Sequence, residues 1–82
     1  MNLLLTPDAS KQLTKLPRIT HSRIFHKLDY LKENPFAGKP LKRNLKGHYS
    51  LKTWPYRIIY TIIKNKQIIL ITAIEHRQGV YK

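Results

Sequence analysis

Cysteine is absent from this 82-residue chain, and acidic residues are scarce, since only four Asp and Glu oppose sixteen Lys and Arg. Without cysteine there is neither a disulfide framework nor a thiolate metal site, which makes the cytoplasm the expected location. No apolar run is long enough to span a membrane. The opening leucines end at Thr6-Pro7-Asp8 and do not form a signal peptide. We therefore expect one small domain, residues 1–82, with a single hydrophobic core.

The formal net charge of +12 indicates a polyanionic partner. The excess is uneven, because residues 1–34 hold six basic and three acidic side chains, whereas residues 35–82 hold ten basic side chains and one acid, Glu75. Basicity that served only solubility would be spread evenly along the chain. The concentration in the second half favours a nucleic-acid partner, with an acidic protein or a membrane surface as the alternatives.

The first 34 residues predict a strand and two helices. Residues 3–5 form the strand, Thr6-Pro7 begins the first helix, and Pro17 limits that helix to about three turns. A second helix is expected from a cap at Thr20 to the stop at Asn34-Pro35. Apolar side chains recur at helical spacing on one face of each helix: Ala9, Leu13 and Leu16 on the first, and Ile24, Leu28 and Leu31, widened by Phe25 and Tyr30, on the second. The two helices would form a hairpin.

The pattern of the second half is typical of a loop and then of strands. Residues 35–46 mix turn formers with cations, which predicts a basic surface loop. Residues 48–54, 56–63 and 67–74 alternate in polarity or are rich in β-branched and aromatic side chains, which predicts a three-stranded antiparallel meander. The two later strands are apolar on both faces and should be central. The fold class is therefore α+β, with an N-terminal strand, a helical hairpin and a meander that completes one small sheet.

The first hairpin of this meander decides which side chains share a face. If the chain turns at Pro55-Tyr56, Trp54 faces Arg57 across the ladder. The period of two then gathers four residues on one face: Ser50, Lys52, Trp54 and Arg57. The other face, toward the helices, receives the apolar set: Tyr49, Leu51, Ile58, Tyr60 and Ile62. Lys52 and Arg57 would lie on an open sheet face, and a slip of one residue would reverse every side chain.

Three strings of the second half resemble the RelE/ParE toxin superfamily, namely residues 45–52 (LKGHYSLK), 56–60 (YRIIY) and 74–77 (IEHR), followed by Val80-Tyr81. The early strand, the helical hairpin and the Asn34-Pro35 stop extend the resemblance to nearly the whole chain. It implies a compact fold similar to the microbial ribonucleases. For the RelE branch it also implies the toxin of a type II toxin–antitoxin system. Such toxins cut messenger RNA in the ribosomal A site by 2′-hydroxyl attack on the adjacent phosphate, without metal or cofactor.

The resemblance also implies site residues. The family places phosphate-binding and catalytic side chains at strand lysines, at the arginine of a Tyr-Arg pair, at a later arginine and at a terminal tyrosine. Those positions hold Lys52, Arg57, Arg77 and Tyr81 here. Where the best-known RelE pattern has a further strand lysine, this chain has Ser50. His48, Lys46 or His76 could substitute for the missing cation, and the identity of the general base stays open.

Arg57 and Lys52 suit this chemistry. Attack by a 2′-oxygen builds negative charge on the phosphate oxygens, and the guanidinium of Arg57 can bind two of those oxygens at once. The alternative for Arg57 is a surface arginine paired with Glu75. Lys52 beside it would act as a base or an electrostatic clamp, or would be an ordinary solvated lysine.

Several roles are open to the residues at the end of the last strand. His76 can exchange protons near neutral pH or only orient the tail. Arg77 fits a second phosphate or leaving-group contact. Tyr81 can stack on a base, take part in proton transfer, or dock onto the sheet. Trp54, in the hairpin, is a base-stacking platform or, more in keeping with its place, a cap over the sheet.

The basic loop is expected to bind RNA. Lys39, Lys42, Arg43 and Lys46, with His48 beside them, would steer the protein toward ribosomal RNA, although a solvated loop is the alternative. The expected partners are therefore messenger RNA, the ribosome and an acidic antitoxin that folds over the basic surface in a hetero-oligomer. Two other functions stay open: a ParE-like poison of DNA gyrase on the same fold, and a non-catalytic RNA-binding module, which Ser50 would permit.

Overall fold

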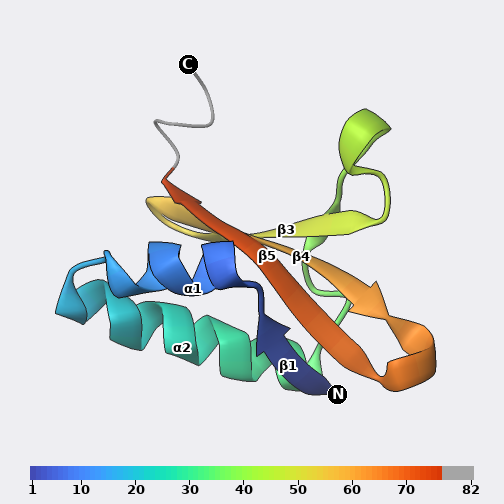
Figure 1. Cartoon of the computed structure of the whole chain (residues 1–82), viewed down its shortest axis with the longest axis horizontal. Helices are drawn as coiled ribbons and strands as arrows, with labels where there is room; N and C mark the ends of the chain where they lie inside the picture. Colours follow the sequence, from blue (N-terminus) through green and yellow to red (C-terminus); the bar gives the residue numbers. More distant parts are fainter. Residues whose placement is uncertain (77–82) are drawn as a thin grey trace.

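Five strands form one mixed sheet, and two helices pack against one of its faces (Figure 1). The structure, a computed structural model, describes residues 1–76. Its elements in chain order are β1 (Asn2–Leu5), α1 (Pro7–Thr14), α2 (Arg18–Glu33), β2 (Lys39–Pro40), the 3₁₀-helix η1 (Arg43–Leu45), β3 (His48–Thr53), β4 (Tyr56–Ile63), the 3₁₀-helix η2 (Lys64–Lys66) and β5 (Ile68–His76). The α+β fold expected from the sequence is confirmed.

The sheet has the strand order β1-β5-β4-β3-β2. Strands β3, β4 and β5 form the expected antiparallel meander, and β4 and β5 lie in the interior of the sheet as their apolar character predicted. Two features were not foreseen. β1 pairs in parallel with β5, and the two-residue strand β2 pairs with β3 inside the region expected to be only a loop.

The first helix begins as the sequence predicted. Thr6 is its N-cap, and the Thr6 Oγ1 accepts a hydrogen bond from the Ala9 N–H at 3.2 Å. The helix ends at Thr14, before Pro17, and Leu16 lies in the turn between the helices. Leu16 still packs, partly buried, against the core.

Helix α2 departs from the expectation at its start and along its flanks. It begins at Arg18, so the cap expected at Thr20 is wrong, and Thr20 is buried inside the helix. Its buried residues follow one stripe: Thr20, Ile24, Leu28 and Leu31. Phe25 and Tyr30 do not widen this stripe, since they are 51% and 49% exposed. Each is one residue, or about 100° of helical rotation, away from a buried position.

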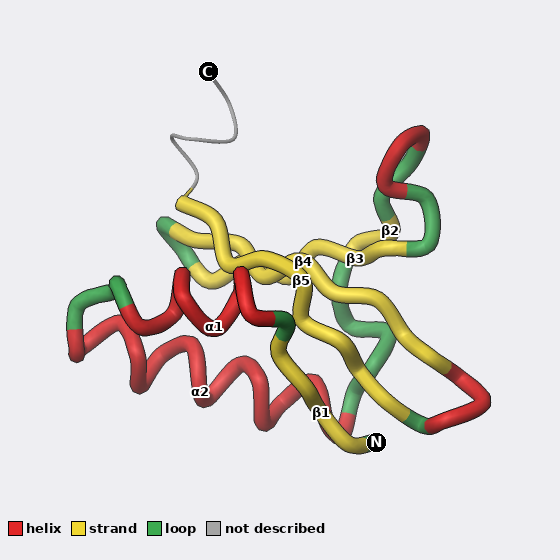
Figure 2. Tube along the Cα trace, in the orientation of Figure 1, coloured by secondary structure: helices red, strands yellow, loops and turns green. Residues whose placement is uncertain are grey.

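The hydrophobic core lies between the helices and the sheet. Its fully buried side chains come from both layers, with Ile24 and Leu31 on α2 and Ile58, Tyr60, Ile69 and Ile71 on the strands. Figure 2 shows α1 and α2 side by side on the same side of the strands. Within residues 1–76, no helix covers the opposite face of the sheet, and no helix is long and apolar enough to cross a bilayer.

The β3–β4 hairpin has a different register from the expected one but the same faces. Lys52, not Trp54, is the Cα partner of Arg57, and the chain turns through Trp54-Pro55, whose peptide bond is cis. The pairing is thus displaced by two residues along β3. Because side chains alternate with a period of two, a displacement of two leaves each of them on its face. Lys52 and Arg57 therefore share the face away from the helices, whereas Trp54 lies in the turn.

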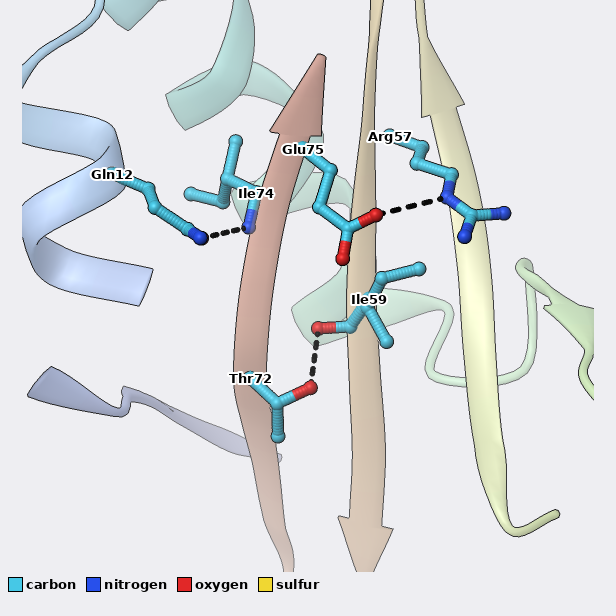
Figure 3. A network of polar contacts seen from close by, with 6 residues as sticks. All are labelled: Gln12, Arg57, Ile59, Thr72, Ile74 and Glu75. Atoms are coloured by element: carbon cyan, nitrogen blue, oxygen red, sulfur yellow. Dashed lines mark hydrogen bonds and ion pairs between the residues drawn. The ribbon is translucent and has the colours of Figure 1, made fainter. Parts of the chain in front are cut away.

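Strand β5 contains one extra residue, which changes the face of the sheet on which each of its last residues lies. The pairing passes from Tyr60↔Ile71 to Ile59↔Ala73 and so skips Thr72. The Thr72 Oγ1 donates to the Ile59 carbonyl at 3.3 Å (Figure 3). A regular alternation from Ile71 would send residue 75 toward the helices. The bulge instead buries Ile74 and sends residue 75 to the open face, a typical effect of such an insertion.

Candidate RNA-binding and catalytic face

Three adjacent strands bring Lys52, Arg57 and Glu75 into one row on the open face. Lys52 on β3 pairs with Arg57 on β4, and Arg57 pairs with Glu75 on β5. Directly paired residues of antiparallel strands have Cβ atoms about 5 Å apart, so these side chains are neighbours. Lys52 is exposed, whereas the side chains of Arg57 and Glu75 are 18% and 35% exposed. The row combines an accessible ammonium with a guanidinium held close to the sheet.

Glu75 contacts one edge of the Arg57 guanidinium. The Arg57 Nε lies 3.6 Å from the Glu75 Oε2, and Figure 3 shows the two terminal nitrogens of Arg57 on the side away from the carboxylate. The pairing with an acid that the sequence offered as an alternative for Arg57 is therefore present. Because the pair involves Nε, the terminal nitrogens, which are the part of an arginine that binds a phosphate with two parallel bonds, point away from the carboxylate.

The end of β5 is held from the helix side. The Gln12 Oε1 on α1 accepts a hydrogen bond from the Ile74 N–H at 2.7 Å, and Ile74 itself is buried. Glu75 is the next residue, so it follows a residue that α1 holds and is itself paired with Arg57 of β4. Rigid support of this kind is what a site needs in order to hold a side chain in one orientation.

His76 is the last residue of β5, and it does not join this row. Its Cα partner is Tyr56, and the two rings meet edge to face with centroids 5.1 Å apart. Alternation along β4 places Tyr56 on the helix side, where it packs against the core. His76 is exposed at the strand end and leaves the sheet on the other side from Arg57. The structure therefore does not bring His76 together with Lys52 and Arg57. The candidate residues Arg77 and Tyr81 lie outside the described residues.

Ser50 and its neighbours occupy the same face further along β3. His48, Ser50 and Lys52 are every second residue of β3 and therefore share that face. Ser50 pairs with Lys39 of β2 on one side and with Ile59 of β4 on the other. Lys39 is exposed. A cation thus lies directly across from the position where the family's further lysine is replaced. The sequence did not point to Lys39 for this place because a two-residue strand such as β2 leaves no periodicity to detect.

The other cations of the basic loop surround this region. Lys42, Arg43 and Lys46 are exposed, and Figure 1 shows the loop around η1 projecting beyond the sheet. His48 is half-buried at the base of the loop, and its Nδ1 has no hydrogen-bond partner among residues 1–76. Lys46 is separated from the sheet by Gly47, whose φ of +91° suits glycine. These side chains extend the cationic surface from the His48 end of β3, whereas Lys52 and Arg57 lie toward the other end of that strand.

A buried tyrosine anchors the start of this loop. The Tyr60 hydroxyl donates to the Pro35 carbonyl at 2.8 Å and accepts from the Gly38 N–H at 2.9 Å. The ring of Tyr49 stacks on that of Tyr60, and a Cβ at residue 38 would lie 2.6 Å from the Tyr60 hydroxyl, so only glycine fits there. Burial raises the pKa of Tyr60 most strongly, the hydrogen bond from Gly38 lowers it by less, and Tyr49 adds a smaller increase. The hydroxyl therefore keeps its proton and its bond to Pro35.

Comparison with known proteins agrees with the fold and the motifs. The family described as "ParE toxin of type II toxin-antitoxin system, parDE" matches residues 3–81. Toxin RelG of Mycobacterium tuberculosis is 33% identical over 79 residues, which cover 94% of this chain and 91% of RelG. Toxin RelE of the same organism is 29% identical over 83 residues, covering 99% of this chain and 86% of that toxin.

Among solved structures, the toxin–antitoxin complex RelBE2 from Mycobacterium tuberculosis contains a chain that superposes with a TM-score of 0.86. The two chains are 29% identical, and the match covers 93% of this chain and 96% of the other. Sequence and fold agree over almost the full length, and the chain belongs to the RelE/ParE superfamily, as a toxin of the type II toxin–antitoxin systems.

Proposed function

We propose that this toxin is a ribosome-dependent endoribonuclease that cleaves messenger RNA in the ribosomal A site, in the cytoplasm, without a metal ion. The observation that carries the proposal is the direct pairing of Lys52 with Arg57 on the sheet face that the helices leave open. Two cations on adjacent strands can hold one phosphate between them, and the strands fix the distance between their backbones. Translation would stop because the messenger is cut.

In the proposed reaction the 2′-oxygen of one nucleotide attacks the adjacent phosphorus. The bond between the 2′-oxygen and phosphorus forms as the bond to the 5′-oxygen breaks, which gives a 2′,3′-cyclic phosphate and a free 5′-hydroxyl. The non-bridging oxygens gain negative charge on the way. Arg57, oriented by Glu75, would stabilise that charge more strongly in the transition state than in the bound messenger.

Two protons must move in this reaction, one from the 2′-hydroxyl and one to the 5′-oxygen. Lys52 is our candidate for the group that accepts the first proton or stabilises the attacking oxygen. Arg77 is the candidate for a contact to the phosphate or the leaving oxygen, and Tyr81 for stacking or proton transfer. His76 stays a candidate acid or base, although its side chain leaves the sheet on the other face from Arg57.

The basic loop would bind the ribosome. Lys39 and His48 border the reacting row, while Lys42, Arg43 and Lys46 extend away from the sheet, where they can contact ribosomal RNA phosphates. Contacts of this kind are independent of sequence and supply most of the affinity for a polyanion. We propose that these cations deliver the toxin to the A site and that the row of Lys52 and Arg57 performs the cleavage.

The proposed partner that restrains the toxin is an acidic antitoxin. The related toxin of the RelBE2 structure is in a complex with its antitoxin. An antitoxin segment that is disordered alone could fold over the basic face, since charge complementarity would offset the cost of ordering it. Such a segment would cover Lys52 and Arg57 and exclude the messenger.

Poisoning of DNA gyrase is the second candidate function, and the match to the ParE family favours it. That activity needs a protein-binding surface and no cleavage of RNA. The two candidate functions predict different effects of removing Arg57. Cleavage of RNA requires its guanidinium at the phosphate, whereas binding to gyrase does not.

One experiment separates the candidates. Purified protein is added to a translating extract, messenger ends are mapped by primer extension, and gyrase supercoiling is measured in parallel. The nuclease predicts cuts in phase with codons that disappear in Arg57→Ala and persist in Lys64→Ala, which removes an exposed cation of the β4–β5 turn. Inhibited supercoiling with intact messenger would establish the gyrase activity instead. If the protein neither cuts messenger nor inhibits supercoiling, it is a binding module without catalysis.

A further inference from the structure

A second cationic feature adjoins the row of Lys52 and Arg57 and shares Lys52 with it. A shallow groove of about 440 Å³ runs between helix α2 and the β3–β4 turn, which lie at the same end of the molecule (Figure 1). It is lined by Ser22, Arg23, His26, Lys27, Lys52, Thr53 and Trp54. A volume of that size is within the range of sites for small ligands. No acidic side chain is present among the lining residues that the structure describes.

The cations of this groove are placed at a cost to the helix. Arg23 and Lys27 are four residues apart on α2, so they project from one face, where like charges repel. Asp29, an acid of the same helix, pairs with Lys32 instead. A like-charged pair with no acid in the same groove favours the binding of an anion.

Trp54 gives the groove an aromatic wall next to these charges. It is 60% exposed, and its carbonyl accepts a hydrogen bond from the Arg23 guanidinium, which ties α2 to the turn. That bond uses one of the five N–H groups of an arginine. An exposed indole beside guanidinium and ammonium groups is the combination that proteins use for single-stranded nucleic acid, in which bases stack and phosphates pair with cations.

Lys52 connects the groove to the row of Lys52 and Arg57. It lines the groove and is also the Cα partner of Arg57. An RNA strand whose scissile phosphate lies at Arg57 would therefore have the groove next to it, on the other side of Lys52.

We propose that the groove between α2 and the β3–β4 turn binds one nucleotide of single-stranded RNA, with the base against Trp54 and the phosphate between Arg23 and Lys27. This inference rests on the proposed function for the identity of the strand, the messenger next to the cleaved bond. An acidic peptide would match the charge of the groove but offers no planar base to place against the exposed face of the indole, so RNA is the better fit.

The single tryptophan of the chain makes the proposal measurable without cleavage. The probe is a hexauridylate with 2′-O-methyl groups, which cannot be cut because the attacking hydroxyl is blocked. We expect saturable quenching of Trp54 fluorescence by this probe and none by hexaglutamate. Quenching by the peptide and not by the RNA would overturn the proposal in favour of an acidic protein partner.

Variants and a charge-matched control complete the test, with affinity measured by anisotropy of the labelled probe. The double variant Arg23→Ala/Lys27→Ala should weaken binding at least about fivefold, and Trp54→Ala should do the same. The control Arg18→Ala/Lys32→Ala removes the same charge from exposed positions on α2 outside the groove. An equal loss in the control would overturn the proposal, because binding would then follow net charge alone.

Two further comparisons keep the outcomes distinct. Lys27→Ala alone leaves the bond between Arg23 and the turn intact, so it tests the groove if the double variant unfolds, as circular dichroism will show. If the protein cleaves messenger but RNA does not quench Trp54, the proposed nucleotide binding in the groove is wrong and the proposed nuclease activity stands. If RNA quenches Trp54 but messenger is not cleaved, the nuclease activity is wrong and binding in the groove stands.

Discussion

At the scale of single residues, the two ends of the Arg57 guanidinium have different roles in the proposed site. Its Nε side contacts Glu75, and the proposed reaction needs its terminal nitrogens for a phosphate. A lysine at the same position would keep the charge but would lose the planar pair of donors and the contact through Nε. The geometry of Arg57 therefore matters as much as its charge.

We predict that Arg57→Ala lowers the rate of messenger cleavage about a hundredfold to a thousandfold, the usual loss when one group that stabilises developing charge is removed. Arg57→Lys should recover only part of that loss. Single-turnover cleavage in a reconstituted translation mixture measures both rates. Full activity in Arg57→Lys would show that charge alone suffices and would remove the role assigned to Glu75.

Glu75 itself should affect binding and cleavage in opposite directions. Glu75→Gln removes a negative charge beside Arg57, so RNA should bind about two- to fivefold more tightly. The cleavage rate of bound RNA should fall about tenfold, because Arg57 loses the partner that orients it. Binding of uncleavable RNA and single-turnover rates separate the two effects, with Glu33→Gln, on exposed helix surface, as the control. Faster cleavage in Glu75→Gln would mean that Glu75 competes with the phosphate for Arg57.

At the scale of elements, the sequence predicted the strands and their faces better than their register. The period of two assigned Lys52 and Arg57 to the open face, and this survived because the pairing is displaced by two residues. Trp54 was misplaced for the same reason, since it lies in the turn and not on the ladder. The bulge at Thr72 was invisible because one inserted residue leaves no local pattern.

Contacts between distant segments were the part that the sequence could not supply. The parallel pairing of β1 with β5 and the pairing of Lys39 with Ser50 join segments with no shared periodicity. The anchor formed by Tyr60 and Gly38 depends on a tertiary hydrogen bond across 22 residues. Arg77 and Tyr81 lie outside the described residues, so their assignment still rests on the resemblance.

The anchor predicts a clear effect of Tyr60→Phe. Loss of the hydroxyl removes the partner of the Pro35 carbonyl and of the buried Gly38 N–H, which should lower the free energy of unfolding by about 1 to 3 kcal/mol. Urea denaturation measures the change. Tyr30→Phe, at an exposed position, is the matched control and should be near neutral. Equal stability of the wild type and Tyr60→Phe would show that the loop start is held by packing alone.

The same residue predicts a pH dependence. Because the pKa of Tyr60 is raised in the folded protein above its ordinary value of 10.0, the unfolded chain loses this proton first as the pH rises. The contribution of Tyr60 is therefore complete below about pH 10 and declines above it. The stability difference between wild type and Tyr60→Phe, from urea denaturation at several pH values, should shrink above pH 10. A constant difference would contradict the assigned shift.

At the scale of the whole molecule, the charge of the chain acts through its distribution. The net charge is +12, and the exposed loop around η1 holds Lys42, Arg43 and Lys46 close together. Lys64 and Lys66 are equally exposed but belong to η2, in the turn between β4 and β5. If the proposed ribosome contact is made by the loop, these two clusters will not be equivalent.

We predict that Lys42→Glu/Arg43→Glu weakens ribosome binding far more than Lys64→Glu/Lys66→Glu, although each variant changes the net charge by four units, from +12 to +8. If both loop cations contact phosphates, the slope of log affinity against log salt should decrease by about 1.4 to 1.8 in the loop variant and little in the turn variant. Sedimentation with ribosomes at several salt concentrations measures both slopes. Equal slopes would mean that the toxin is attracted by its total charge, and the loop would then have no particular role in delivering it to the A site.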